Sequence, residues 1–122
     1  MQKFTAIGHL GADPEMRFTP KGIAVTDFPI AINDYNDNTM WVRVTLWEDK
    51  AENAKEYLSK GDQVYVEGVL QFDNKTGGPE TYVSKKDGKT YTNFKMTAYS
   101  IEYLKTSRKQ ETPEKEVAPW KR

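Results

Sequence analysis

The sequence predicts a small, mainly β domain that carries one short helix. Apolar and polar residues alternate over several short segments, and this period of two is typical of strands with one buried face. Helical spacing of apolar residues occurs over one stretch only, 49–58. Gly, Pro, Asn and Asp cluster between the segments, as they do in turns. The chain of 122 residues is the size of one domain, which can bury a core without disulfides or metals.

The first two strands are expected over 3–10 and 23–32, with turns and a short segment at 15–19 between them. One side of the first strand is formed by Phe4, Ala6, Gly8 and Leu10. The core face of the second is formed by Ala24, Thr26, Phe28, Ile30 and Ile32. Pro29 lacks the N–H that a central strand uses, which favours an edge or a bulge there.

Residues 40–47 form the clearest strand, because their two sides differ in character. The apolar side carries Met40, Val42, Val44 and Leu46. The other side carries Trp41, Arg43, Thr45 and Trp47. The helix is expected over 49–58, and Gly61 follows it as a stop signal. Its apolar positions are Ala51, Ala54, Tyr57 and Leu58.

A fourth strand is expected over 63–72, and its core side carries Val64, Val66, Gly68, Leu70 and Phe72. Residues 82–94 predict a hairpin in which Asp87-Gly88 suits a tight turn. The last strand, 92–104, completes a domain of residues 1–104. Residues 105–122 are charged, contain two prolines and lack periodicity, so a disordered tail is expected.

The predicted order is strand, strand, strand, helix, strand, strand. This is the plan of a five-stranded OB-fold barrel with Greek-key connections and one helix between strands 3 and 4. A small β-sandwich is the alternative that the strand pattern leaves open.

The formal net charge is zero, from 18 basic and 18 acidic residues. Residues 1–104 hold 12 basic and 15 acidic residues, whereas 105–122 hold 6 basic and 3 acidic. A polyanion would therefore have to bind a local basic stripe. The chain has no cysteine, no signal-peptide core and no apolar run near the roughly 20 residues of a membrane span. A cytoplasmic protein without a membrane partner is expected.

Catalytic chemistry finds little support in the residues. His9 is the single histidine, so no histidine pair exists to bind a metal. No phosphate-binding glycine loop and no nucleophile with an adjacent base can be identified. Neither an enzyme, a metal nor a cofactor is expected.

Trp41, Arg43 and Trp47 share the strand side that faces away from the expected core. Exposed rings beside a cation suit unstacked bases, because every base has a π face, and arginine binds phosphate or stacks. A second core layer or a subunit interface is the alternative. The predicted hairpin interleaves rings with cations, namely Tyr82, Lys85, Lys86, Lys89 and Tyr91. A merely solubilising set of lysines is the alternative there.

Three blocks of the chain resemble the bacterial-type single-stranded DNA-binding proteins. They are IGHLGADPEMRFTPKGIAVTDFPIA, MWVRVTLWEDKAENAKEYLSKGDQVYVEGVL and YTNFKMTAYSIEYL, within residues 2–104. The resemblance implies an OB-fold that usually assembles as a homotetramer. It also implies sequence-independent binding of single-stranded DNA in replication, recombination and repair, in a protein associated with the nucleoid.

The resemblance further implies which residues contact DNA. Trp41 matches the tryptophan of the family's W-x-R-V block, and Trp47 falls at an aromatic position that ends the same strand. Tyr35 stands where many members have a loop tryptophan, and Tyr82 lies near the family's hairpin tryptophan. Positions of phosphate-contacting cations are occupied here by Lys3, Arg17, Arg43 and Lys60.

The chain also departs from the family pattern. Val42 replaces a histidine that is associated with subunit contacts, so a dimer is the alternative to a tetramer. The chain ends VAPWKR, whereas the family's acidic, hydrophobic tip recruits replication and repair proteins. Three alternatives to DNA binding remain: a protein-interaction module of the primosomal accessory type, an RNA-binding OB domain, and a nuclease.

Overall fold

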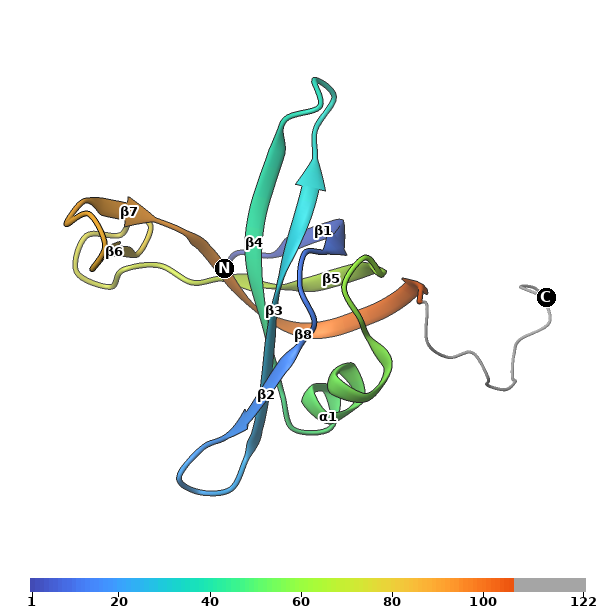
Figure 1. Ribbon diagram of the computed structural model, residues 1–122. Coiled ribbons are helices and arrows are strands. Elements are labelled where there is room, and N and C mark those ends of the chain that lie inside the picture. The colour runs from blue at the N-terminus through green and yellow to red at the C-terminus, as the bar shows by residue number, and fades with distance from the viewer. Residues whose placement is uncertain (107–122) are drawn as a thin grey trace.

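The structure is a computed structural model that describes residues 1–106 (Figure 1). Its elements are β1 (Phe4–Leu10), β2 (Glu15–Phe18), β3 (Ala24–Asn33), β4 (Thr39–Trp47), α1 (Glu48–Tyr57), β5 (Gln63–Leu70), β6 (Thr81–Val83), β7 (Thr90–Thr92) and β8 (Phe94–Lys105). The predicted tail lies outside the described residues from residue 107 onward, and Lys105 ends β8. No helix in the described part is both long and apolar enough to cross a membrane.

Five strands close into a barrel. The strand order is β1-β5-β8-β4-β3, and β1 also pairs with β3, which joins the two ends of the sheet. β4 and β8 are parallel, whereas the other neighbours in the barrel are antiparallel. This order and the position of α1 between the third and fourth barrel strands are those of an OB-fold. The predicted fold is confirmed, and closure of the barrel rules out the sandwich.

The core fills the barrel as the alternation predicts. The largest side chains with almost no exposure include Phe28, Ile30, Leu46, Leu58 and Met96. The same period of two leaves Trp41, Arg43 and Trp47 outside, because successive side chains of a strand point to opposite faces. At Gly68 a Cβ atom would lie 2.0 Å from the carbonyl oxygen of Thr97, so only glycine fits where β5 crosses β8 at a bulge.

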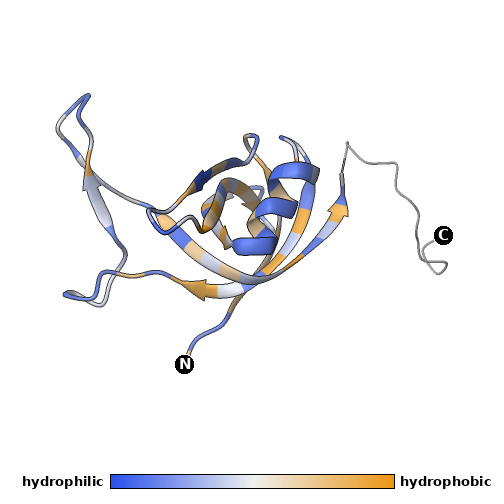
Figure 2. Ribbon diagram, turned by 90° about the horizontal axis from the view of Figure 1, so that it is seen from below, coloured by the Kyte–Doolittle hydropathy of each residue, from blue (hydrophilic) through white to orange (hydrophobic). Residues whose placement is uncertain are grey.

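Helix α1 lies across one end of the barrel (Figure 2). Ala51 and Ala54 are fully buried, and the buried hydroxyl of Thr26 donates to the carbonyl oxygen of Ala51 over 2.7 Å. Leu58 follows the helix and is buried as expected. Tyr57, expected on the apolar face, is instead 43% exposed. The buried stripe of α1 is narrow, because it consists of Ala51 and Ala54, so Tyr57 lies beside the contact and not within it.

Three further local predictions need correction, and the first of them concerns Pro29. β3 is an interior strand, so an edge position is wrong. On one side of β3, pairing with β2 ends at Asp27 and pairing with β1 begins at Ile30. The carbonyl of Pro29 accepts from the N–H of Gly11 on that same side. The missing N–H of proline therefore falls in the gap between two partner strands, where no ladder bond is lost.

The second and third corrections concern strand ends. β5 ends at Leu70, and Phe72 is 51% exposed, so it is not part of the core. The hairpin forms as predicted, but its turn is longer than two residues: the N–H of Ser84 donates to the carbonyl of Lys89, and Gly88 has a φ of 70°. In this register Tyr82 stands directly opposite Tyr91, where cross-strand aromatic pairs are stabilising.

Candidate nucleic-acid interface

The outer face of β3 and β4 presents a row of aromatic and cationic side chains. Register pairs Trp41 with Ala31, Arg43 with Pro29 and Trp47 with Val25, so the partners of the row are small or apolar. Trp41 is 53% exposed and Trp47 is 43% exposed. Half-exposed rings do not form a second core layer among residues 1–106. The two rings stand six residues apart on one strand, a span of about 20 Å.

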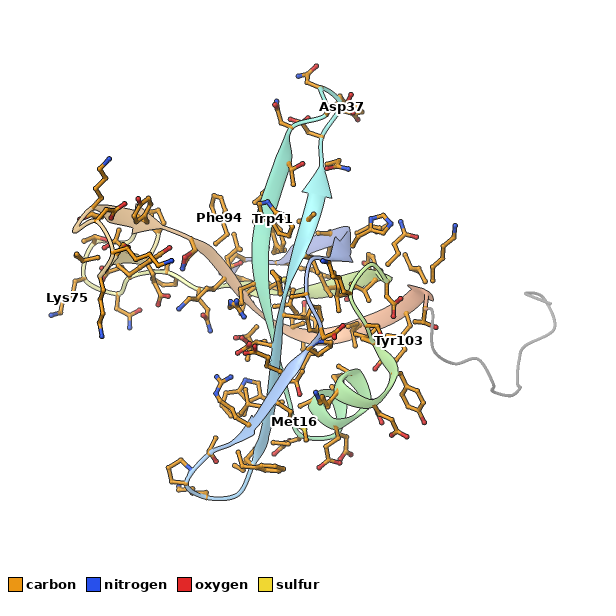
Figure 3. The ribbon with its side chains drawn as sticks, in the orientation of Figure 1. Met16, Asp37, Trp41, Lys75, Phe94 and Tyr103 are labelled. Atoms are coloured by element: carbon orange, nitrogen blue, oxygen red, sulfur yellow. The ribbon has the colours of Figure 1, made fainter. Side chains whose placement is uncertain are left out.

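The ring of Trp41 lies against the start of the β1–β2 loop, on the outside of β4 (Figure 3). A Cβ atom at Gly11 would lie 2.5 Å from Cζ3 and 2.8 Å from Cη2 of this ring. The backbone of Gly11 is held in turn, because its N–H donates to the carbonyl of Pro29 over 2.9 Å. Glycine at this position therefore supports one edge of the ring and leaves the rest open to solvent.

Trp47 is positioned by an abrupt junction between strand and helix. It is the last residue of β4 and the N-cap of α1, and Glu48 adopts a φ of 60°. Val25, its partner on β3, faces outward by register yet is only 1% exposed, so neighbouring side chains cover it. The position of Trp47 thus has one apolar edge and one solvent-facing edge, which suits a ring that packs on the protein and stacks on a base.

Two predicted cations meet at one carboxylate. Nη1 of Arg17 on β2 is 2.6 Å from Oδ2 of Asp27, and Nη1 of Arg43 on β4 is 2.9 Å from Oδ1. The carboxylate lies on β3, between the strands that carry the two arginines. Both arginine side chains remain about half exposed, which leaves N–H donors available on the solvent side.

An open groove of about 800 Å³ continues from Arg43 toward the β6–β7 hairpin. Its lining is mixed in charge and includes Arg43, Phe72, Lys75, Glu80, Tyr82 and Lys95. Lys95 pairs in register with Arg43 on the parallel strand β4, and its Nζ lies 3.5 Å from Glu80. Figure 3 shows Lys75 on the loop beside the hairpin. The groove thus connects the row on β4 to the hairpin.

The hairpin carries the remaining aromatic pair. The ring centroids of Tyr82 and Tyr91 are 5.8 Å apart with an interplanar angle of 31°. The hydroxyl of Tyr91 donates to Oδ2 of Asp87 over 2.5 Å, which lowers the pKa of Asp87 and raises that of Tyr91. The exposed tip carries Lys85, Lys86 and Lys89. Tyr82 lines the groove, whereas Tyr91 stabilises the turn.

Three predicted site residues, Tyr35, Lys60 and Lys3, lie apart from the β4 row with its arginine pair, from the groove and from the hairpin. Tyr35 is fully exposed on the β3–β4 loop, which projects from the end of the barrel opposite α1 (Figure 1). Asp34 shapes that loop: its Oδ1 accepts from the N–H groups of Asn38 and Asn36, which lower its pKa. Lys60 lies beside the β1–β2 loop, where its N–H donates to Asp13. Lys3 is paired with Glu67 of β5 at 3.8 Å.

The structure adds two residues that the sequence did not indicate. Phe72 continues the period of two of β5, which predicts a core position, yet it lines the groove. It also borders a smaller apolar groove of about 440 Å³ with Phe94 and Pro79. Lys95 is a neighbour of Arg43 only because β4 and β8 pair in parallel. No local pattern signals a neighbour about 50 residues away in the chain.

Comparison with known proteins agrees with this geometry. Residues 1–90 match the model of the single-strand binding protein family. A "Single-stranded DNA-binding protein" of Oceanobacillus iheyensis is 32% identical over 116 residues, which cover 90% of this chain and 67% of that protein. "Single-stranded DNA-binding protein 1" of Chlorobaculum tepidum is 40% identical over 89 residues, 63% of this chain and 55% of its own. A Neisseria meningitidis "Single-stranded DNA-binding protein" is 36% identical over 112 residues, 85% of this chain and 60% of its own. The chain thus spans about half to two thirds of these relatives, and it belongs to the single-strand binding protein family.

Proposed function

We propose that this chain binds single-stranded DNA without sequence preference, by stacking bases on exposed rings and pairing phosphates with nearby cations. The observation that carries the proposal is the half-exposed row Trp41, Arg43 and Trp47 on one sheet face. The groove beside Arg43 extends this row toward Tyr82. Relatives that are named as single-stranded DNA-binding proteins support the same ligand.

Stacking explains binding that ignores sequence, because all four bases present a π face of similar character. Each stacked base contributes about 1–3 kcal/mol. Trp41, Trp47 and Tyr82 are the rings proposed to stack bases along the row and groove. Tyr35 would contact single-stranded DNA that continues past the end of the barrel. Tyr91 acts in the same hairpin through its contact with Tyr82.

Phosphate contacts complete the proposal. The cations proposed to contact phosphates are Lys3, Arg17, Arg43, Lys60, Lys85, Lys86, Lys89 and Lys95. Residues 1–104 carry more acidic than basic residues, so attraction must come from these local cations rather than from the field of the whole domain. Each phosphate that is neutralised releases counterions, so binding weakens as salt rises.

The wider role that we propose is protection and handling of single strands in replication, recombination and repair, in the cytoplasm and without catalysis. Residues 1–104 would act as the binding domain and 105–122 as its tail. Ile7, Val69 and Tyr99 are exposed on the adjacent strands β1, β5 and β8, outside the proposed DNA face. Such apolar residues suit contact with a second copy, in a dimer or a tetramer.

The test is a titration with poly(dT) at two salt concentrations, followed by tryptophan fluorescence. A Trp120→Phe variant leaves Trp41 and Trp47 as the two remaining tryptophans of the sequence. Saturable quenching that persists at moderate salt is expected, and Trp41→Phe or Trp47→Phe should each remove part of it. An absence of quenching at low salt would overturn the stacking mechanism and favour a protein-interaction module.

Two further arms separate the remaining alternatives. Competition between DNA and RNA oligonucleotides of the same sequence should favour DNA, and a preference for RNA would reassign the ligand. A labelled single strand incubated with the protein and Mg²⁺ should remain intact, and cleavage would identify a nuclease.

A further inference from the structure

Asp27 places a negative charge at the centre of the proposed DNA face. By register its neighbours are Glu15 on β2 and Thr45 on β4, so it stands in the middle of three paired strands. Its two oxygens each contact one guanidinium, that of Arg17 at 2.6 Å and that of Arg43 at 2.9 Å. The Asp27 side chain is only 13% exposed, whereas the two arginines are 62% and 47% exposed.

This arrangement limits where a phosphate can bind. Asp27 has a short side chain on a strand with partners on both sides, so its carboxylate stays close to the surface of β3, beneath the longer arginine side chains. The two ion pairs use Nη1 of each guanidinium, whereas each guanidinium carries five N–H donors in all. A phosphate therefore reaches Arg17 and Arg43 from the solvent side, with a carboxylate directly beneath them. The two guanidinium groups, the carboxylate of Asp27 and the exposed carboxylate of neighbouring Glu15 act on it together.

Resting on the proposed function, we propose that Asp27 is a built-in competitor of the DNA phosphates for Arg17 and Arg43. Its charge cancels one of the two cations and lowers the affinity for any polyanion. The binding that remains depends more on stacking, at Trp41 and Trp47, and less on counterion release. DNA binding at this site is therefore weaker and also less sensitive to salt.

Asp27→Asn tests this inference, because asparagine keeps the shape and one acceptor but removes the charge. We expect the variant to bind a (dT) oligonucleotide about five- to tenfold more tightly at low salt. The slope of log K against log salt should steepen by about 0.7, the value for one additional phosphate contact on a single strand. The matched control is Glu52→Gln, the same charge change at an exposed position of α1, which should leave the slope unchanged.

A double-mutant cycle assigns the effect to the arginines. In a chain that carries Arg17→Gln and Arg43→Gln, the gain from Asp27→Asn should disappear. Thermal unfolding verifies that each variant is folded, and Asp27→Thr, which is uncharged and suits a strand, replaces Asp27→Asn if the latter is unstable.

The outcomes are distinct. Tighter binding with a steeper slope supports the inference. Unchanged affinity and slope, while the unaltered chain binds DNA, would overturn it, because the arginines would then not meet phosphate. Weaker binding by a folded variant would also overturn it, and would show that Asp27 serves to position the arginines. Failure of the unaltered chain to bind (dT) at all would refute the proposed function itself.

Discussion

Replacing Gly11 by alanine should displace the ring of Trp41 without unfolding the barrel. The added Cβ would lie 2.5 Å from Cζ3 and 2.8 Å from Cη2, whereas ordinary contact begins at about 3.4 Å. The ring must therefore move by about 1 Å. Gly11 does not have a positive φ, so the backbone itself accepts alanine. Trp41 is half exposed and can move outward, which relieves the clash.

The expected free-energy costs follow from the role of the Trp41 ring in the folded chain and in the complex with DNA. Overpacking at a half-exposed site should cost about 1 kcal/mol of folding stability, the low end of the range for such changes. Loss of one stacked base should cost about 1–3 kcal/mol of binding, or about 5- to 150-fold in affinity for single-stranded DNA. Binding should therefore suffer more than folding.

The assay is fluorescence anisotropy of a labelled (dT) oligonucleotide, which does not depend on tryptophan emission. Gly11→Ala, Trp41→Ala and the double variant form a cycle, and the loss from Gly11→Ala should vanish when Trp41 is absent. Gly78→Ala is the matched control, because its Cβ would meet only the Thr76 hydroxyl at 3.6 Å. Unchanged affinity in Gly11→Ala, or an equal loss without Trp41, would refute the reasoning.

Three further predictions address stability, pH and the groove. Thr26→Val removes the buried hydrogen bond to Ala51 and should cost about 1–3 kcal/mol, measured as a lower urea midpoint; an unchanged midpoint would contradict the anchoring of α1 by this bond. Burial raises the pKa of Tyr103 to about 12 from its usual 10, so the stabilisation that it provides is complete below pH 10 and is lost as the pH rises through 12. Tyr103→Phe should remove this alkaline loss of stability. If the unaltered chain and Tyr103→Phe show the same change in stability between pH 10 and 12, this role of Tyr103 is contradicted. Phe72→Ala should weaken binding to (dT) by about 1–3 kcal/mol and leave stability nearly unchanged, whereas the reverse result would return Phe72 to the core.

Local periodicity was sufficient to predict most elements and the two faces of β4. Alternation separates Val42 and Val44 from Trp41 and Arg43, because a strand points successive side chains to opposite sides. Helical spacing predicts the buried positions Ala51 and Ala54 for the same local reason. These signals extend over a few residues, so they are fully present in the chain before it folds.

Pairing between distant strands was decided by the tertiary structure. Closure of β1 on β3 selects the barrel over the sandwich, and the parallel contact of β4 with β8 brings Lys95 to Arg43. The period of two also continues past the end of β5, so it placed Phe72 in the core although no partner strand follows it there. The alternation is local, but which strand end finds a partner depends on packing of the whole barrel.

The predicted site was likewise determined in part by the sequence and in part by the fold. The sequence by itself determined that Trp41, Arg43 and Trp47 share an outward face. Only the tertiary structure decided that Gly11 supports the Trp41 ring and that Asp27 forms ion pairs with Arg17 and Arg43. Both contacts join residues from different strands or loops, and their geometry exists only once the register of β2, β3 and β4 is set.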